Sequence, residues 1–205
     1  MFRRDETSLG DRVFHQIAAA IVDEELAPGL RVRDVTLGER YHVSRSPVRE
    51  ALHRLERVGL VEILPSRVTR VTLVTDDVVA ETVVYAGYQA GLAARQGAAF
   101  MTTAERTQAL GLIDAVRASL SDRVASSAHR RALFGFLAAQ GDNRLHRAHM
   151  RDMEYAFERN LRQADLPSGP EAERSLDALQ AAILRSDPVE AERWARAMHG
   201  VVPPG

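Results

Sequence analysis

Residues 43–52 have the sequence VSRSPVREAL, and this stretch decides the fold of the N-terminal part of the chain. Ser46 followed by Pro47 predicts a helix start, because a serine side chain caps free N–H groups and proline has no N–H to lose in the first turn. Apolar residues follow at helical spacing on one face: Val48, Ala51, Leu52, Leu55 and Val58. Basic residues recur every four positions on the other face: Arg49, His53 and Arg57. Gly59 then ends the helix.

Two further helices are predicted before this one. The first begins near Ser8, which forms a capping box with Asp11, and it ends at residues 27–29, Ala-Pro-Gly. A short second helix fits Thr36 to Tyr41, and residues 42–44 form the turn to the third helix.

A β-hairpin is predicted directly after the third helix. Its strands are Val61 to Leu64 and Thr69 to Val74, with residues 65–67 as the turn. Arg67 lies at the tip of this hairpin and Arg70 lies close to it. Helix, helix, turn, helix and hairpin is the order of a winged helix-turn-helix.

The charge of this segment favours a polyanionic partner. Residues 26–70 contain nine arginines against five acidic residues, whereas the whole chain has a net charge of -1. A helix N-terminus attracts phosphate, and an arginine near that N-terminus can reach guanine in the major groove. All 27 basic residues are arginine, which we attribute to genome composition because it extends over the whole chain.

The N-terminal sequence resembles the GntR family of bacterial regulators over about the first 74 residues. The resemblance is carried by Pro28-Gly29, by residues 43–52, by Leu55-Glu56 and by residues 59–61, Gly-Leu-Val. It implies that four side chains contact double-stranded DNA, with the two arginines nearest to the bases: Ser44, Arg45, Ser46 and Arg49.

The chain departs from the family pattern at two positions. An arginine that the family often has on its second helix is Val35 here, and Arg33 is the nearest substitute. The glycine usual at the hairpin tip is Val68, which makes a contact between DNA and the wing at Arg67 an open question.

The remainder of the chain is predicted to be all helical. We therefore expect a mainly α protein, with a winged helix-turn-helix domain over residues 1–74 and an all-α bundle over residues 75–205. The expected helices are Asp76–Gln96, Thr103–Leu120, Arg123–Gln140, Asn143–Gln163, Glu171–Arg185 and Pro188–His199. Ala132 to Ala139 is apolar on all sides and is expected at the centre of the bundle, whereas Leu145, His149 and Met153 begin an apolar stripe on the next helix.

This helical half is similar to the FCD branch of the GntR family, the fatty-acid-regulator-like subfamily. Many members of that branch hold a metal with one aspartate and three histidines, and the metal binds a carboxylate effector. The four ligand positions fall on His129, Leu133, Leu176 and Met198. Leucine cannot bind a metal, so no metal cofactor is expected. The alternative is a site rebuilt from other histidines: His129, His146, His149 and His199.

Apolar residues at former metal positions predict either an apolar or acyl-type organic effector or a cavity that has closed. The candidate polar groups facing such a cavity are Tyr85, Tyr88, Gln89, His129 and His149.

The expected function is that of a DNA-binding transcriptional repressor, acting as a homodimer on a palindromic operator and controlled by a small molecule. The alternative is a DNA-binding regulator without a small-molecule ligand, controlled by a protein partner or by abundance. An enzyme is not expected, because catalytic serine-histidine-aspartate spacing, a phosphate loop and cysteine are all absent from the sequence. A charged N-terminus and the lack of a long apolar run predict a cytoplasmic location without membrane contact.

Overall fold

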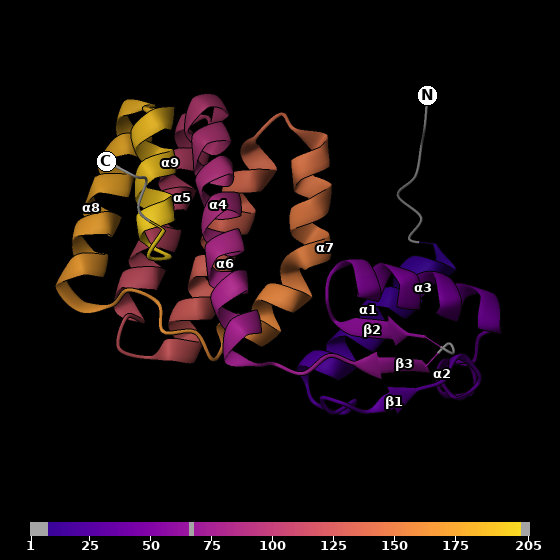
Figure 1. Ribbon diagram of the computed structural model, residues 1–205. Coiled ribbons are helices and arrows are strands. Elements are labelled where there is room, and N and C mark those ends of the chain that lie inside the picture. The colour runs from indigo at the N-terminus through magenta and orange to yellow at the C-terminus, as the bar shows by residue number, and fades with distance from the viewer. Residues whose placement is uncertain (1–7, 66–67, 202–205) are drawn as a thin grey trace, which may run out of the picture. The chain divides into compact units, whose positions relative to one another are not determined.

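The computed structural model describes residues 8–65 and 68–201 and divides into two compact units, Met1–Val74 and Thr75–Gly205 (Figure 1). The first unit contains α1 (Leu9–Val22), β1 (Arg31–Val32), α2 (Asp34–Tyr41), α3 (Arg45–Arg57), β2 (Val61–Leu64) and β3 (Val68–Val71). The second contains α4 (Asp76–Phe100), α5 (Thr103–Ala118), α6 (Arg123–Gln140), α7 (Arg144–Leu161), α8 (Gly169–Arg185) and α9 (Pro188–Ala197). This arrangement confirms the predicted mainly α fold class. Within the described ranges, no helix combines the length and hydrophobicity needed to traverse a bilayer.

The core of the first unit lies between α1 and α3, which pack against each other. The predicted capping box is present, because the Ser8 hydroxyl accepts from the Asp11 N–H and the Asp11 carboxylate accepts from the Ser8 N–H. Side chains of both helices are fully buried in this core: Val13, Phe14, Ile17, Ile21, Val48, Ala51 and Leu55. Burial of the apolar face of α3 leaves its opposite face to solvent.

Helix α3 begins two residues earlier than predicted. Ser44, not Ser46, is the N-cap residue, and Arg45 is the first helical residue. Pro47 therefore occupies the third helical position. Because the first turn of a helix has no internal acceptors for its N–H groups, proline is tolerated in either register.

The small sheet has three antiparallel strands in the order β1-β3-β2. The predicted hairpin is β2 and β3, in which Val61 pairs with Val71 and Leu64 with Val68. Strand β1 was not predicted, because two residues are too short to show an alternating pattern. It places Arg31 opposite Arg70 on β3.

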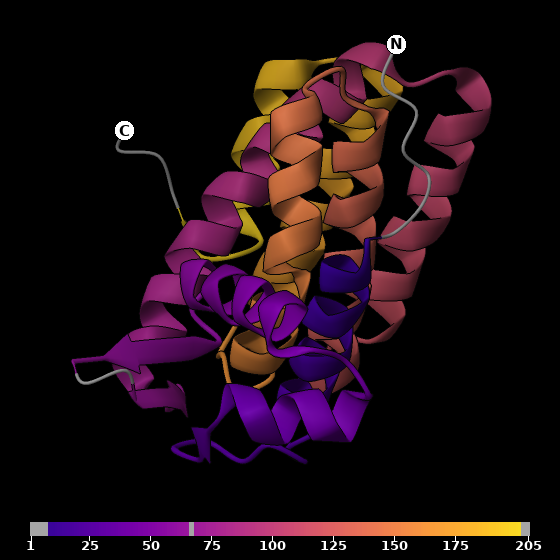
Figure 2. The same ribbon diagram turned by 90° about the vertical axis from the view of Figure 1, so that its right-hand side faces the viewer.

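The second unit is built around α4, which packs against α6, α7 and α9. Its predicted helices are confirmed, with ends that differ by a few residues. The core is formed by small residues of α4 and by larger ones from α5, α6, α8 and α9, among them Ala93, Ala94, Ile113, Leu133, Leu137, Leu176, Leu179, Ile183 and Met198. Figure 2 shows α6 and α7 lying side by side in this unit.

Two predictions about buried faces in this unit were wrong. The stretch Ala132 to Ala139 is not buried on all sides, because Ala132, Gly135 and Ala139 are exposed. The apolar stripe on α7 does not begin at Leu145, which is 81% exposed, and His149 is exposed as well. The buried residues of α7 instead include His146 and Phe157, and this helix packs against α4 and α6.

Gly97 on α4 permits a close approach to α6, because a Cβ atom added there would lie 2.9 Å from the carbonyl oxygen of Leu137. We expect Gly97→Ala to lower the free energy of unfolding by about 1–3 kcal/mol, since α4 and α6 must move apart. Gly111→Ala on α5 is the control, because a Cβ there meets nothing within 4 Å. It should raise that free energy by about 0.5–1 kcal/mol through its lower backbone entropy. Urea unfolding followed by circular dichroism measures both, and equal shifts would contradict the packing argument.

Candidate nucleic-acid interface and helical-unit cavity

The first turn and a half of α3 exposes four polar side chains, which we call the α3 N-terminal surface: Ser44, Arg45, Ser46 and Arg49. The side chains of Arg45 and Arg49 are 56% and 59% exposed. They point away from the core because Val48, Ala51 and Leu52 occupy the buried face of the same helix. The structure thus brings together the four residues that the sequence predicted as DNA contacts.

Asp34, the first residue of α2, pairs with both arginines of this surface. Its carboxylate lies 3.0 Å from Nη2 of Arg45 and 2.7 Å from Nε of Arg49. Desolvation alone would raise the pKa of the Asp34 carboxyl, but hydrogen bonds from Arg49 and Arg45 outweigh it and the pKa lies below its usual value. Asp34 is therefore ionised at neutral pH and holds two guanidinium groups on one side of α3.

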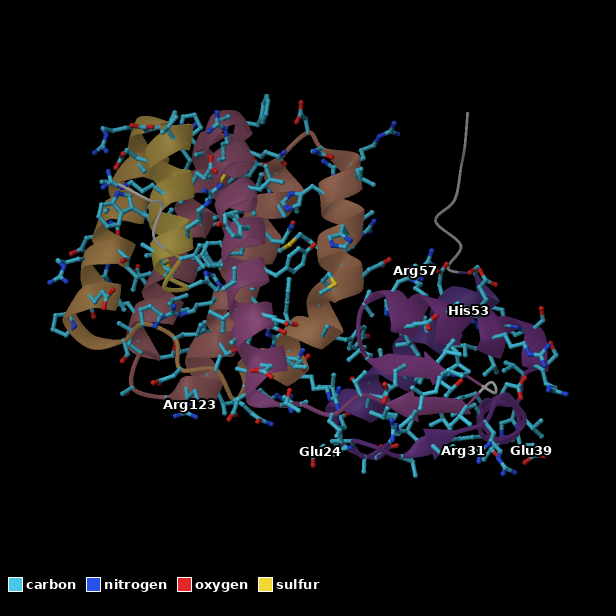
Figure 3. All side chains as sticks on the ribbon, in the orientation of Figure 1. Glu24, Arg31, Glu39, His53, Arg57 and Arg123 are labelled. Carbon is cyan, nitrogen blue, oxygen red and sulfur yellow. The ribbon has the colours of Figure 1, made fainter. Side chains whose placement is uncertain are left out.

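A hollow of about 620 Å³ adjoins this surface, between α3, the start of α2 and the sheet. Arg31, Arg33, Arg45 and Arg49 line it together with the single acid Asp34. The structure thus places the predicted substitute Arg33 beside the two helix arginines. Figure 3 labels Arg31 near this region and His53 on α3, and both residues also line the hollow.

The wing is described in part. Arg67, which was predicted to contact DNA, lies outside the described residues. Val68 is the first residue of β3 and pairs with Leu64. Near the base of the wing, Arg70 is held by Glu62 at 2.9 Å.

These features can bind a phosphate backbone and bases at once. The free N–H groups at the start of α3 and the positive end of its dipole favour a phosphate oxygen. Exposed guanidinium groups beside them can donate pairs of hydrogen bonds to guanine O6 and N7. The exposed start of a helix with a basic hollow beside it fits the major groove of DNA.

Residues 9–71 match the family model described as bacterial regulatory proteins, gntR family. These residues form a gntR-family winged helix-turn-helix domain. The match extends from the first residue of α1 to the last residue of β3, so it includes every helix and strand of the first unit.

Curated relatives align with this gntR-family domain. An uncharacterized HTH-type transcriptional regulator from the TAR-I ttuE-ttuC' intergenic region of Agrobacterium vitis is 36% identical over 66 residues, 31% of this chain and 39% of that protein. The HTH-type transcriptional regulator Mce2R of Mycobacterium tuberculosis is 43% identical over 65 residues, 31% of this chain and 27% of that protein. The similarity to these relatives thus spans well under half of their length.

Solved structures share the whole fold. E. coli McbR/YncC superposes with a TM-score of 0.66 at 17% identity and covers 95% of both chains. A putative transcriptional regulator GntR from Rhodococcus sp. RHA1 gives a TM-score of 0.60 at 20% identity, covering 93% of this chain and 95% of that one. At these identities the likeness shows the fold alone, a winged helix-turn-helix followed by a helical unit.

The helical unit contains a cavity of about 590 Å³ between α4, α6 and α7. Its apolar lining includes Ala86 and Ala90 of α4, Phe134, Gly135 and Phe136 of α6, and Met150, Phe157 and Leu161 of α7. Four arginines and one glutamate also line it: Arg130, Arg131, Arg147, Arg151 and Glu154. His199, just after α9, completes one end. We call this the α6–α7 cavity.

The five side chains predicted to face a cavity do not line this one. The structure brings two of them together, because the Tyr85 hydroxyl and His149 Nε2 form a hydrogen bond between α4 and α7. The guanidinium of Arg196 instead lies over the ring of Tyr88, with its Cζ 4.9 Å from the centre of that ring. Gln89 and His129 are half-buried. These residues lie on other faces of their helices than the neighbours that line the cavity.

The metal-binding positions of the FCD branch do not fit a metal here. Leu133, Leu176 and Met198 are fully buried members of the apolar core and offer no nitrogen or oxygen ligand. Within the described residues, no group of three or more potential ligands could hold an ion, and this covers the alternative set of histidines as well.

The polar residues that line the cavity were not predicted from the sequence. Arg130 and Arg131 lie three and four positions after Ser127, and the buried Phe134 lies four positions after Arg130. Polar residues on an otherwise apolar helical stripe could have indicated a buried polar site. His199, which the sequence offered only as part of the alternative metal site, is 4% exposed and its Nδ1 forms a hydrogen bond with the Ala195 carbonyl. Desolvation lowers the pKa of His199 to about 4, so its ring is neutral at pH 7.

Asp34→Asn should loosen both guanidinium groups of the gntR-family domain and remove a negative charge that repels DNA. We expect binding to unrelated DNA to strengthen, while the preference for a specific site falls, because the arginines lose their common anchor. The plot of log affinity against log salt concentration should become steeper by about 0.9, the slope expected for one additional phosphate contact. Asp34→Glu is the control, since it keeps the charge. Fluorescence anisotropy with specific and scrambled duplexes at several salt concentrations measures these effects, and unchanged preference in Asp34→Asn would refute the anchoring role.

Proposed function

We propose that this protein is a sequence-specific DNA-binding transcriptional regulator whose α3 N-terminal surface enters the major groove. The observation that carries the proposal is the exposure of Arg45 and Arg49 at the start of a helix whose opposite face is core. Arg49 and Arg45 are the base-reading residues, and Ser44 and Ser46 contact phosphate. The gntR-family match over the same residues supports this assignment.

The regulator acts as a homodimer on a palindromic operator. A single winged helix-turn-helix domain presents one short recognition helix, which buries less surface than a tight specific complex requires. Two copies related by a two-fold axis would read two half-sites about one helical turn apart.

Sedimentation equilibrium of the full chain should accordingly give twice the 22.6 kDa mass of one chain. The mass of the protein should be the same with and without operator DNA, once the mass of the DNA has been subtracted. A monomer at the concentrations that saturate an operator would contradict the dimer.

We propose that a small organic molecule controls the regulator. Binding of this molecule to the helical unit releases the repressor from its operator. The α6–α7 cavity supports this part, because its volume of about 590 Å³ lies within the range of known ligand sites, about 300–1,000 Å³. A regulator controlled by a protein partner or by abundance would leave this cavity without a ligand.

DNA binding is tested with the full chain and an operator selected from a random duplex library. Arg49→Ala should lose about 1–3 kcal/mol of specific binding and should relax preference at one base position in each half-site. Arg57→Ala is the matched control, because it removes the same charge from the last turn of α3. Arg57→Ala should weaken binding to operator DNA and to scrambled DNA by the same factor. Equal affinity of the wild-type protein for operator and scrambled duplexes would refute the proposed function.

A further inference from the structure

Val35 is an apolar side chain that is exposed beside the arginines of the α3 N-terminal surface. It is the second residue of α2, directly after Asp34, and it is 44% exposed. Leu37, two residues further along the helix, is 3% exposed and belongs to the core. Successive residues of an α-helix are rotated by about 100°, so Val35 and Leu37 point to nearly opposite sides of α2. The burial of Leu37 therefore turns Val35 toward solvent.

The position of Val35 distinguishes it from the other exposed apolar residues of the first unit. Three more large apolar residues are exposed in the described part of this unit: Leu9, Leu30 and Leu73. None of these three lines the hollow of about 620 Å³, whereas Val35 does. Single apolar residues are common on protein surfaces. Val35, however, shares its hollow with four arginines, at the place where the proposed function puts the edge of a base.

The hollow has an apolar floor as well as a basic lining. Val32 of β1 and Leu52 of α3 line it and are almost fully buried, and the half-buried Ile63 of β2 lines it too. The exposed Val35 lies nearer to solvent than these buried residues. A ligand in the hollow therefore meets an apolar contact in addition to guanidinium groups.

Asp34 connects Val35 with the two arginines of α3. The carboxylate of Asp34 lies 3.0 Å from Nη2 of Arg45 and 2.7 Å from Nε of Arg49. Val35 follows Asp34 directly, and consecutive Cα atoms are about 3.8 Å apart. Because base pairs are stacked about 3.4 Å apart, a group that Val35 contacts should lie within about three base pairs of a guanine read by these arginines.

The major groove offers one apolar group to such a side chain. The hydrogen-bond donors and acceptors of the base edges are polar, and the 5-methyl group of thymine is the apolar exception. Contact between this methyl group and Val35 removes two apolar surfaces from water, which contact with a polar base edge cannot do. Valine is stiff about χ1 in a helix, so the contact costs little side-chain entropy.

We propose that Val35 contacts the 5-methyl group of a pyrimidine base, and that it thereby adds a preference for thymine to the reading of guanine by Arg45 and Arg49. This inference rests on the proposed function, since it requires α3 to lie in the major groove. The side chain of Val35 forms no hydrogen bond and discriminates by the presence of one methyl group. Because 5-methylcytosine carries the same methyl group, the test distinguishes the two bases.

The test uses the full chain and the operator that is selected for the wild-type protein. Each thymine of one half-site is replaced in turn by deoxyuridine, which pairs in the same way and lacks only the 5-methyl group. Wild-type affinity should fall about four-fold at one thymine, the factor expected for one methyl group that is no longer buried. This thymine should lie within about three base pairs of the guanine at which Arg49→Ala relaxes the preference. Fluorescence anisotropy measures the affinities.

Val35→Ala shows whether the valine makes this contact. Because Val35 is exposed, its truncation should leave the fold intact, and the variant should bind the thymine and deoxyuridine operators with nearly equal affinity. Val35→Ile should keep the difference between the two operators. Leu9→Ala is the matched control and should keep it as well, because Leu9 is 43% exposed and does not line the hollow. An undiminished difference in Val35→Ala, or its loss in Leu9→Ala, would overturn the inference.

The remaining outcomes separate the two bases and the two proposals. A second series of operators carries 5-methylcytosine in place of each cytosine of the half-site. Stronger binding at one methylated cytosine by the wild-type protein, but not by Val35→Ala, would support the inference with 5-methylcytosine as the base. If neither base responds while the operator still binds more tightly than scrambled DNA, the inference fails and the DNA-reading function stands. A wild-type protein without preference for any operator would overturn both.

Discussion

Burial of one face of α3 against α1 is the interaction on which the functional surface depends. Val48, Ala51 and Leu55 are removed from water on that face, and this fixes the direction in which the other residues of α3 point. Arg45 and Arg49 are exposed as a result, at the end of the helix where free N–H groups and the dipole favour an anion. Asp34 then restrains both side chains, so the domain holds two exposed arginines in a defined arrangement.

Much of this domain could be predicted from residues 43–52, because the spacing of apolar residues in a helix is a local property. The exact start of α3 could not, since Ser44 and Ser46 are equally good caps and Pro47 is tolerated in either register. Strand β1 and the role of Asp34 depend on tertiary contacts. Nothing in the local sequence indicates that an acid eleven and fifteen residues away pairs with Arg45 and Arg49.

In the helical unit the sequence predicts the positions of the helices well, but it predicts poorly which side of each helix is buried. Long periodic segments and clear breaks are enough to locate α4 to α9. Which side of a helix is buried depends on its neighbours, and α6 is apolar on nearly every side over residues 132–139. For residues 132–139 the sequence therefore could not distinguish a closed core from a cavity lining. The polar residues that precede them, Ser127 and Arg130, did carry a signal, whereas Tyr85 and His149 were expected at a cavity that they do not line.

The division of α6 into two faces has a consequence for how this protein can change. Leu133 and Leu137 secure the bundle, whereas Ala132, Gly135 and Ala139 border empty space. Substitutions at Ala132, Gly135 or Ala139 change the volume of the cavity. They cost little free energy of folding, because they neither create nor fill a gap in the core. Under the proposed function, selectivity for a new ligand can therefore evolve, or be engineered into a biosensor, through a few small-residue positions without a change in the bundle core.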